Sequence, residues 1–188
     1  MRRDQLEHIV RAATALIGED EIVVIGSQAI LGSHPEWLPH VVLRSVEADV
    51  FPPDDPEGAK SDVIDGAIGE GSMFHHTFGV YAHGVSERTA RLPAGWRDRL
   101  VPVSNENTRG AVGWCLEPHD LWVSKALAGR PNDLEFCRAL LRSGFVDAST
   151  LQERLAAVDA SHAELEAARS LARVQRGGTD GHHTQVPS

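Results

Sequence analysis

The sequence predicts a small α/β (α+β) domain in which a mixed β-sheet core is followed by a C-terminal helical cap. Short, β-branched apolar runs bounded by glycine and proline are concentrated in the first 116 residues, whereas segments of helical periodicity fill most of the remainder. We therefore expect residues 1–116 to hold the sheet and an N-terminal helix. Residues 117–176 should form the helical part of the same domain, and the polar, Gly-rich residues 177–188 should be disordered.

Each element follows from hydrophobic periodicity and from the glycine and proline residues that interrupt it. The predicted helices span residues 4–17, 28–31, 56–68, 117–128, 132–142, 149–158 and 161–176. The predicted strands span residues 21–25, 46–51, 78–85, about 99–103 and 111–116. Gly18 ends the first helix, Pro52-Pro53 stops the second strand, and Pro118 suits the first turn of the helix that follows the last strand.

Composition excludes several classes of protein. The chain has 188 residues, of which 41% are hydrophobic and 24% charged, as in one soluble globular domain. No apolar run approaches the ~20 residues of a membrane span, and the N-terminus lacks the apolar core of a signal peptide. We therefore expect a cytoplasmic protein with no membrane partner. The net charge of −9 argues against coating nucleic acid through bulk electrostatics. Cys115 and Cys137 are expected to be free buried thiols.

An acid pair on the second predicted strand suggests a metal site. Side chains alternate faces along a strand, so Glu47 and Asp49 point the same way while Ala48 and Val50 point the other. Two neighbouring acids repel each other unless a cation lies between them. Hard oxygen ligands at this spacing suit Mg²⁺ or Mn²⁺. The alternative is a solvent-facing sheet edge with two acids that have no function.

A Gly-Ser turn follows the first predicted strand. Glycine at position 26 allows the backbone to approach a ligand closely, and a helix that begins after it presents free N–H groups to an anion. Ser27 adds a hydroxyl donor for a phosphate. The alternative is that Ser27 is an ordinary helix N-cap. About twenty residues separate this turn from the acid pair.

The combination of turn and acid pair resembles the polymerase-β-like nucleotidyltransferase superfamily. The run Arg44-Ser45-Val46-Glu47-Ala48-Asp49 is similar to that of AbiEii-like and related toxin nucleotidyltransferases, in which an arginine and a Ser or Thr precede the acids. A second block, with Lys125 before Gly129-Arg130-Pro131-Asn132-Asp133, is similar to the helix, lysine and Gly-Arg-x-x-Asp segment of the same proteins. The match covers roughly residues 21–142.

This resemblance implies a metal-dependent enzyme that moves a nucleotide from an NTP to an RNA or protein hydroxyl, with an antitoxin as a possible partner. Glu47 and Asp49 would hold Mg²⁺ or Mn²⁺, and Lys125 would assist catalysis. The nucleotide would contact Gly26, Ser27, Arg44, Ser45, Arg130 and Asp133. Simpler alternatives are a surface lysine at position 125 and an ion pair at the helix junction for Arg130 and Asp133.

The sequence departs from the family pattern in two places. Glu47 stands where aspartate is more usual, and the strand predicted over 78–85 lacks the third carboxylate that many relatives carry. Tyr81 and His83 share a face of that strand; His83 is either a base, a metal ligand or a structural residue. The missing acid favours the alternative of a non-catalytic protein that binds nucleotides or partners. The arginines between Arg88 and Arg99 form either a contact surface for an acidic substrate or a solvated loop.

Overall fold

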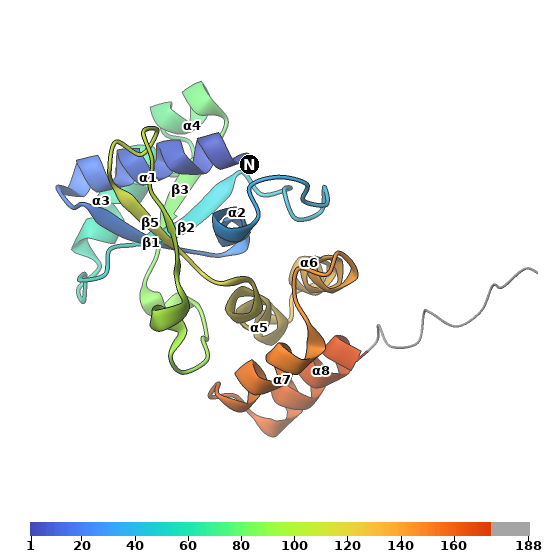
Figure 1. Cartoon of the computed structure of the whole chain (residues 1–188). Helices are drawn as coiled ribbons and strands as arrows, with labels where there is room; N and C mark the ends of the chain where they lie inside the picture. Colours follow the sequence, from blue (N-terminus) through green and yellow to red (C-terminus); the bar gives the residue numbers. More distant parts are fainter. Residues whose placement is uncertain (174–188) are drawn as a thin grey trace, which may run out of the picture.

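The computed structural model describes residues 1–173, which contain one mixed five-stranded sheet in the order β3-β2-β1-β5-β4 (Figure 1). The strands are β1 (Glu21–Ile25), β2 (Glu47–Phe51), β3 (Tyr81–Gly84), β4 (Val101–Val103) and β5 (Val112–Cys115). β1 pairs parallel with β5 and antiparallel with β2, and β2 pairs parallel with β3. The predicted fold class, a mixed sheet with a helical C-terminal part, is confirmed. The disorder predicted for 177–188 lies outside the described residues.

Helices precede, connect and follow the strands (Figure 1). They are α1 (Arg3–Ile17), α2 (Ile30–Ser33), α3 (Ala59–Ile68), α4 (Met73–Phe78), α5 (Pro118–Ala128), α6 (Pro131–Arg142), α7 (Ala148–Ala156) and α8 (His162–Arg173). Short 3-10 turns are η1 (Ser27–Ala29), η2 (Glu87–Thr89) and η3 (Trp96–Arg99). Within residues 1–173, none of the helices combines the length and apolar character needed to cross a bilayer.

Helices α1 and α3 cover one face of the sheet. On that face Val10 of α1 contacts Gly113 of β5, and the backbone at Ser61 of α3 contacts Gly84 of β3. The register pairs Gly84 with Val50, so Val50 and its neighbour two residues away, Ala48, point to the same face, and both are fully buried. Glu47 and Asp49 therefore lie on the opposite face, which remains available for a site.

The strand predicted over residues 78–85 is shorter than expected because α4 precedes it. Phe78 is the last residue of α4, and β3 begins at Tyr81. The helix is stabilised by its ends: the Ser72 hydroxyl accepts a hydrogen bond from the His75 N–H, and Gly79 ends it in the left-handed conformation. Hydrophobic periodicity missed α4 because the helix buries none of its residues.

A buried ion cluster fastens the cap to the sheet half. Asp120 of α5 has a fully buried side chain, with its two oxygens 2.8 Å from Arg99 Nε and 3.2 Å from Arg154 Nε. Arg99 ends η3 and Arg154 lies on α7, so three elements meet at one carboxylate. The cluster makes the position of α5 depend on segments before and after it.

The arginines between Arg88 and Arg99 are largely engaged within the molecule. Arg91 pairs with Glu164 of α8 at 2.9 Å and donates to the Leu127 carbonyl at 2.7 Å. Arg97 lies 2.6 Å from Glu87, and Arg99 joins the ion cluster at Asp120. Most of this segment is therefore neither a simple solvated loop nor a free basic surface, because its arginines connect it to the cap and to itself.

Candidate functional site

A cleft of about 570 Å³ separates the open face of the sheet from α5 and α6. It is lined by Ser27, Val41, Val42, Arg44, Ser45, Glu47, Asp49, Lys125, Arg130, Pro131, Asn132, Asp133 and Phe136. All of the site residues predicted from the sequence lie on this lining except Gly26, which packs against Asp49 from the end of β1. The structure thus brings together residues from the first strand to the sixth helix.

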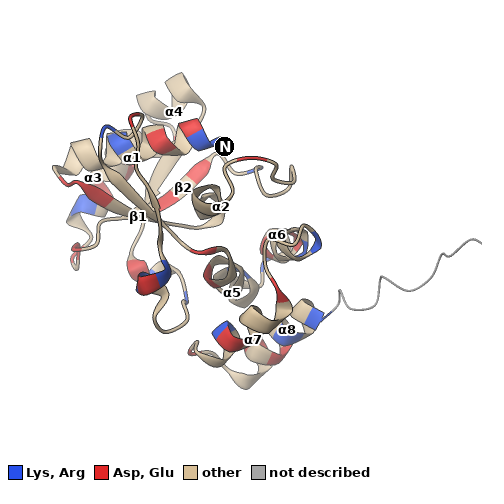
Figure 2. Cartoon of the chain, viewed as in Figure 1, with Lys and Arg blue, Asp and Glu red and all other residues tan. Residues whose placement is uncertain are grey.

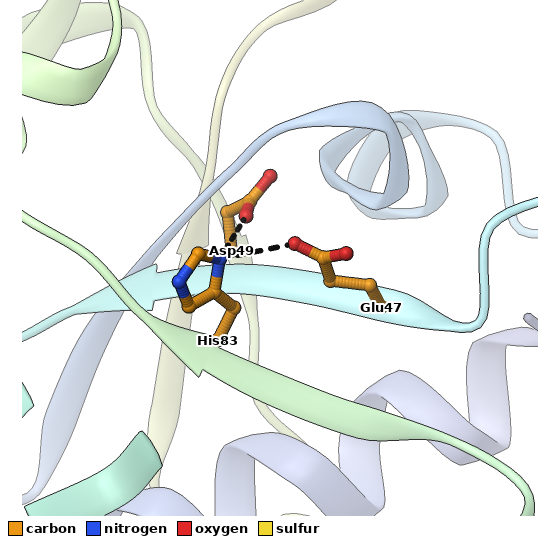
Figure 3. Close-up of side chains that lie close together, drawn as sticks. All are labelled: Glu47, Asp49 and His83. Atoms are coloured by element: carbon orange, nitrogen blue, oxygen red, sulfur yellow. Dashed lines mark hydrogen bonds and ion pairs between the residues drawn. The ribbon is translucent and has the colours of Figure 1, made fainter. Parts of the chain in front are cut away.

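The acid pair lies on β2, and β3 adds two side chains to it. Glu47 and Asp49 point to the same side of the strand, and His83 reaches them from the neighbouring strand (Figure 3). His83 Nδ1 lies 3.1 Å from Glu47 Oε1 and 3.4 Å from Asp49 Oδ1. The Tyr81 hydroxyl donates a hydrogen bond to Glu47 Oε2 at 2.9 Å. One donor atom each from Glu47, Asp49 and His83 lies within 4.8 Å of the others.

The sequence left open whether His83 is a base, a metal ligand or a structural residue, and the structure places it beside the acid pair. Alternation along β3 places Tyr81 and His83 on one face, and this signal was visible in the sequence. The parallel register that sets Tyr81 beside Glu47 and His83 beside Asp49 is a tertiary property, and only the structure shows it. The place opposite Asp49 on the adjacent strand is therefore held by an imidazole.

The pKa values of the two carboxyl groups are shifted in opposite directions. Burial, followed by the adjacent Glu47, raises the pKa of Asp49 to about 6. Burial also acts to raise the pKa of Glu47, but hydrogen bonds with Asp49, Tyr81 and His83 outweigh it and lower that pKa. Two close acids in a partly buried position, with an imidazole beside them, are donors that a divalent cation takes. The residues present therefore fit a metal ion.

The Gly-Ser turn lies at the end of β1, next to the acid pair. Gly26 has φ +68° and ψ −173°, which turns the chain sharply before Ser27 begins η1. The expected helix is a 3-10 turn of three residues followed by the four-residue α2. The helix dipole is consequently small. The turn can still bind a phosphate, because the Gly26 backbone allows close approach and Ser27 provides a hydroxyl group.

The opposite wall comes from the junction of α5 and α6. Gly129 ends α5 in the left-handed conformation, and Pro131 occupies the first turn of α6. Lys125 Nζ donates to Asp133 Oδ1 at 2.9 Å, so Asp133 anchors the lysine at the cleft. Arg130 is exposed at the start of α6. The ion pair at this helix junction therefore joins Asp133 to Lys125, and within the described residues Asp133 forms none with Arg130.

Arg44 and Ser45 lie on the cleft lining but are engaged with other protein groups. Arg44 donates to both oxygens of Glu135 on α6, at 2.9 and 3.3 Å. The Ser45 hydroxyl accepts from the Glu47 N–H at 3.1 Å and so fixes the start of β2. Arg44 therefore connects the segment before β2 with α6 beside the cleft, and a nucleotide would have to compete with Glu135 for its guanidinium.

Charge is distributed unequally between the two walls. Figure 2 shows acidic positions on β2, and both acidic and basic positions on α6. Glu47 and Asp49 supply the negative wall, while Arg130 and the Asp133-paired Lys125 supply positive charge opposite them. A ligand that carries both a metal ion and phosphate groups matches this polarity.

The structure thus combines a mixed sheet, an acid pair beside a Gly-Ser turn, and a lysine and an arginine across a cleft, which are the features in which the sequence resembles nucleotidyltransferases. The family model described as "Nucleotidyltransferase of unknown function (DUF6036)" matches residues 4–176, and the chain belongs to this family. No curated protein and no solved structure matches the chain.

Proposed function

We propose that this protein transfers a nucleotide from an NTP to an acceptor hydroxyl with a divalent metal ion, Mg²⁺ or Mn²⁺, held by Glu47 and Asp49. The observation that carries the proposal is the meeting of this acid pair with the Gly26-Ser27 turn and Lys125 at one cleft. When bound, the metal neutralises the triphosphate and makes an acceptor hydroxyl more acidic.

The roles of the side chains follow from their chemistry. Ser27 donates a hydrogen bond to an outer phosphate oxygen, and Lys125 offers a point charge as negative charge develops there. Arg130 presents a planar fork that binds phosphate oxygens in pairs. The acceptor oxygen forms a bond to the α-phosphorus while the bond from that phosphorus to the bridging oxygen breaks. Pyrophosphate leaves, and the hydroxyl proton passes to water.

The acceptor and partner are proposed from sequence similarity. The Arg44-Ser45 pair before the acids and the Gly-Arg-x-x-Asp segment at 129–133 are similar to toxin nucleotidyltransferases. On this basis the acceptor is an RNA end or a protein hydroxyl, and an antitoxin is the partner. The absence of an acid on β3, which reads Tyr81-Ala82-His83-Gly84, supports the second candidate, a non-catalytic nucleotide-binding or interaction module.

Thermal melting with each of the four NTPs, with and without Mg²⁺ or Mn²⁺, tests the proposed site. A nucleotide at about 100 times its dissociation constant stabilises the folded state by roughly 2.7 kcal/mol. We expect a metal-dependent shift for at least one NTP, and we expect Asp49→Asn to remove it. Asp62→Asn is the matched control, because Asp62 is an exposed acid on α3 outside the cleft.

Transfer is measured separately with a labelled NTP and pools of RNA and protein acceptors. Label transfer that is lost in Glu47→Gln and Asp49→Asn establishes the enzyme. Metal-dependent binding without transfer to any acceptor favours the non-catalytic module. No shift with any nucleotide, in the presence of either metal, contradicts the proposed nucleotide site and with it the proposed function.

A further inference from the structure

His83 occupies the position on β3 that faces the acid pair most directly. The parallel register sets His83 beside Asp49, and β3 is the edge strand of the sheet, so no further strand covers this side of the pair in the described chain. The imidazole is half exposed, with 50% of its side-chain surface accessible. The Glu47 and Asp49 side chains are also partly exposed, at 34% and 26%, so an ion that enters from solvent can reach all three residues.

The spacing of the donor atoms fits one coordination sphere. In an octahedral site with bonds of about 2.1 Å, neighbouring ligand atoms lie about 3 Å apart. His83 Nδ1 lies 3.1 Å from Glu47 Oε1 and 3.4 Å from Asp49 Oδ1. These two separations are close to those between neighbouring ligands of an octahedron, and one donor atom from each of the three residues lies within 4.8 Å of the others.

Tyr81 leaves the correct oxygen of Glu47 free for this arrangement. Its hydroxyl donates to Oε2 of Glu47, whereas Oε1 is the oxygen that faces His83. A hydrogen bond of this kind orients a ligating carboxylate from outside the coordination sphere. Glu47 therefore offers one oriented oxygen to the same point as His83 Nδ1.

We propose that His83 Nδ1 is the third protein ligand of the metal ion, and that this nitrogen makes the site prefer Mn²⁺ to Mg²⁺. The inference rests on the metal site of the proposed function and adds a preference for one metal ion over the other. Mg²⁺ strongly favours oxygen ligands and gives up water reluctantly, whereas Mn²⁺, a first-row transition metal, exchanges a water for an imidazole nitrogen more readily than Mg²⁺ does. A face of two carboxylates and one imidazole thus differs in preference from a face of three carboxylates.

Calorimetric titration of the full chain with MnCl₂ and with MgCl₂, in the absence of nucleotide, measures this preference directly. The variants are His83→Asp, His83→Ala, Tyr81→Phe and the control His76→Ala. His76 is an exposed histidine on α4 outside the cluster. The measurement is repeated with His182→Ala and His183→Ala in every protein, so that imidazoles near the C-terminus make no contribution.

Substitution of His83 is expected to change the ratio of the two affinities. His83→Ala should weaken Mn²⁺ binding by about 10- to 100-fold, the range over which even the outer-shell partners of a metal ligand act. His83→Asp should shift the preference toward Mg²⁺, because the face then consists of oxygens alone. Tyr81→Phe should weaken both metals alike and leave their ratio unchanged. His76→Ala should change neither affinity.

Pulsed electron paramagnetic resonance of the Mn²⁺ complex gives a second readout, independent of affinity. Protein labelled with ¹⁵N-histidine should show a nitrogen coupled to the manganese, and His83→Asp should abolish this coupling. Mn²⁺ binding with no coupled nitrogen, or an unchanged affinity ratio in His83→Asp, overturns the inference and leaves the acid-pair site intact. Failure of the wild-type protein to bind either metal overturns the inference and the proposed function together.

Discussion

Gly26 lies directly against the carboxylate of Asp49, so closely that a Cβ added to Gly26 would be 2.0 Å from Asp49 Oδ2. The backbone of Gly26, with φ +68° and ψ −173°, lies in a region that is essentially restricted to glycine. The turn and the acid pair are therefore packed together, and the position of the Asp49 carboxylate depends on the absence of a side chain at Gly26.

Gly26→Ala should abolish metal binding as well as destabilise the fold. The backbone strain alone costs about 1–3 kcal/mol, and the new methyl group displaces Asp49. The measurements are Mn²⁺ titration and chemical denaturation. Gly18→Ala is the matched control, because Gly18 also has a positive φ, +70°, but a Cβ there meets nothing within 4 Å. It should lower stability and leave metal binding unchanged. Normal metal binding by Gly26→Ala would show that Asp49 moves without consequence.

Removal of the Lys125 charge should affect both stability and nucleotide binding. Lys125→Met leaves Asp133, whose side chain is only 9% exposed, without its partner. Loss of one member of a buried pair costs about 3–5 kcal/mol. The double variant Lys125→Met with Asp133→Asn should recover much of the stability and none of the nucleotide affinity. Denaturation and NTP melting shifts test this, and recovery of nucleotide binding in the double variant would exclude a direct role for Lys125.

Asp120→Asn should destabilise the protein far more than loss of an exposed ion pair. The carboxylate is fully buried between Arg99 and Arg154, so its neutralisation leaves two guanidinium groups without their counter-charge, at a cost of about 3–5 kcal/mol. Glu87→Gln removes the exposed partner of Arg97 and should cost less than about 1 kcal/mol. Urea denaturation of both variants checks the contrast. Equal effects would show that the cluster does not hold the cap.

Stability should depend on pH through Glu117 and His119. Burial acts to raise the pKa of Glu117, but hydrogen bonding to His119 outweighs it and lowers that pKa. Burial acts to lower the pKa of His119, but Glu117 and Asp147 outweigh it and raise that pKa. The Glu117 contribution is present above its ordinary value of 4.5 and is lost as the pH falls further. The His119 contribution is present below its ordinary value of 6.5 and is lost as the pH rises through the raised value.

The stabilisation from this pair is consequently greatest between the two ordinary pKa values. The free energy of unfolding of the wild type minus that of His119→Gln should peak in this window when both are denatured over about pH 3 to 9. A difference that does not change with pH would mean that His119 acts only through packing and neutral hydrogen bonds.

The sequence was informative wherever a local rule determines the structure. Alternation along one strand placed Glu47 and Asp49 on the same face, and the structure has them there. The Gly26-Ser27 turn and the Lys125 block were recognised by residue type and spacing, and both lie at the cleft. These features depend on neighbours within a few positions, which a single sequence contains.

The remainder depends on contacts between distant segments. The place of His83 is set by the parallel pairing of β3 with β2, for which the sequence carries no signal. Engagement of Arg44 by Glu135 joins positions 91 residues apart, and the ion cluster at Asp120 draws Arg99 and Arg154 from both sides in sequence. Helix α4 escaped prediction for a different reason, since capping residues and not an apolar face define it.

The two walls of the cleft come from segments that lie far apart in the sequence. Glu47 and Asp49 belong to the second strand, whereas Lys125, Arg130 and Asp133 follow the last strand. While the chain is being made on a ribosome, the acid pair therefore emerges long before the positive wall that faces it. The cleft, with both of its walls, can form only after α6 has been synthesised.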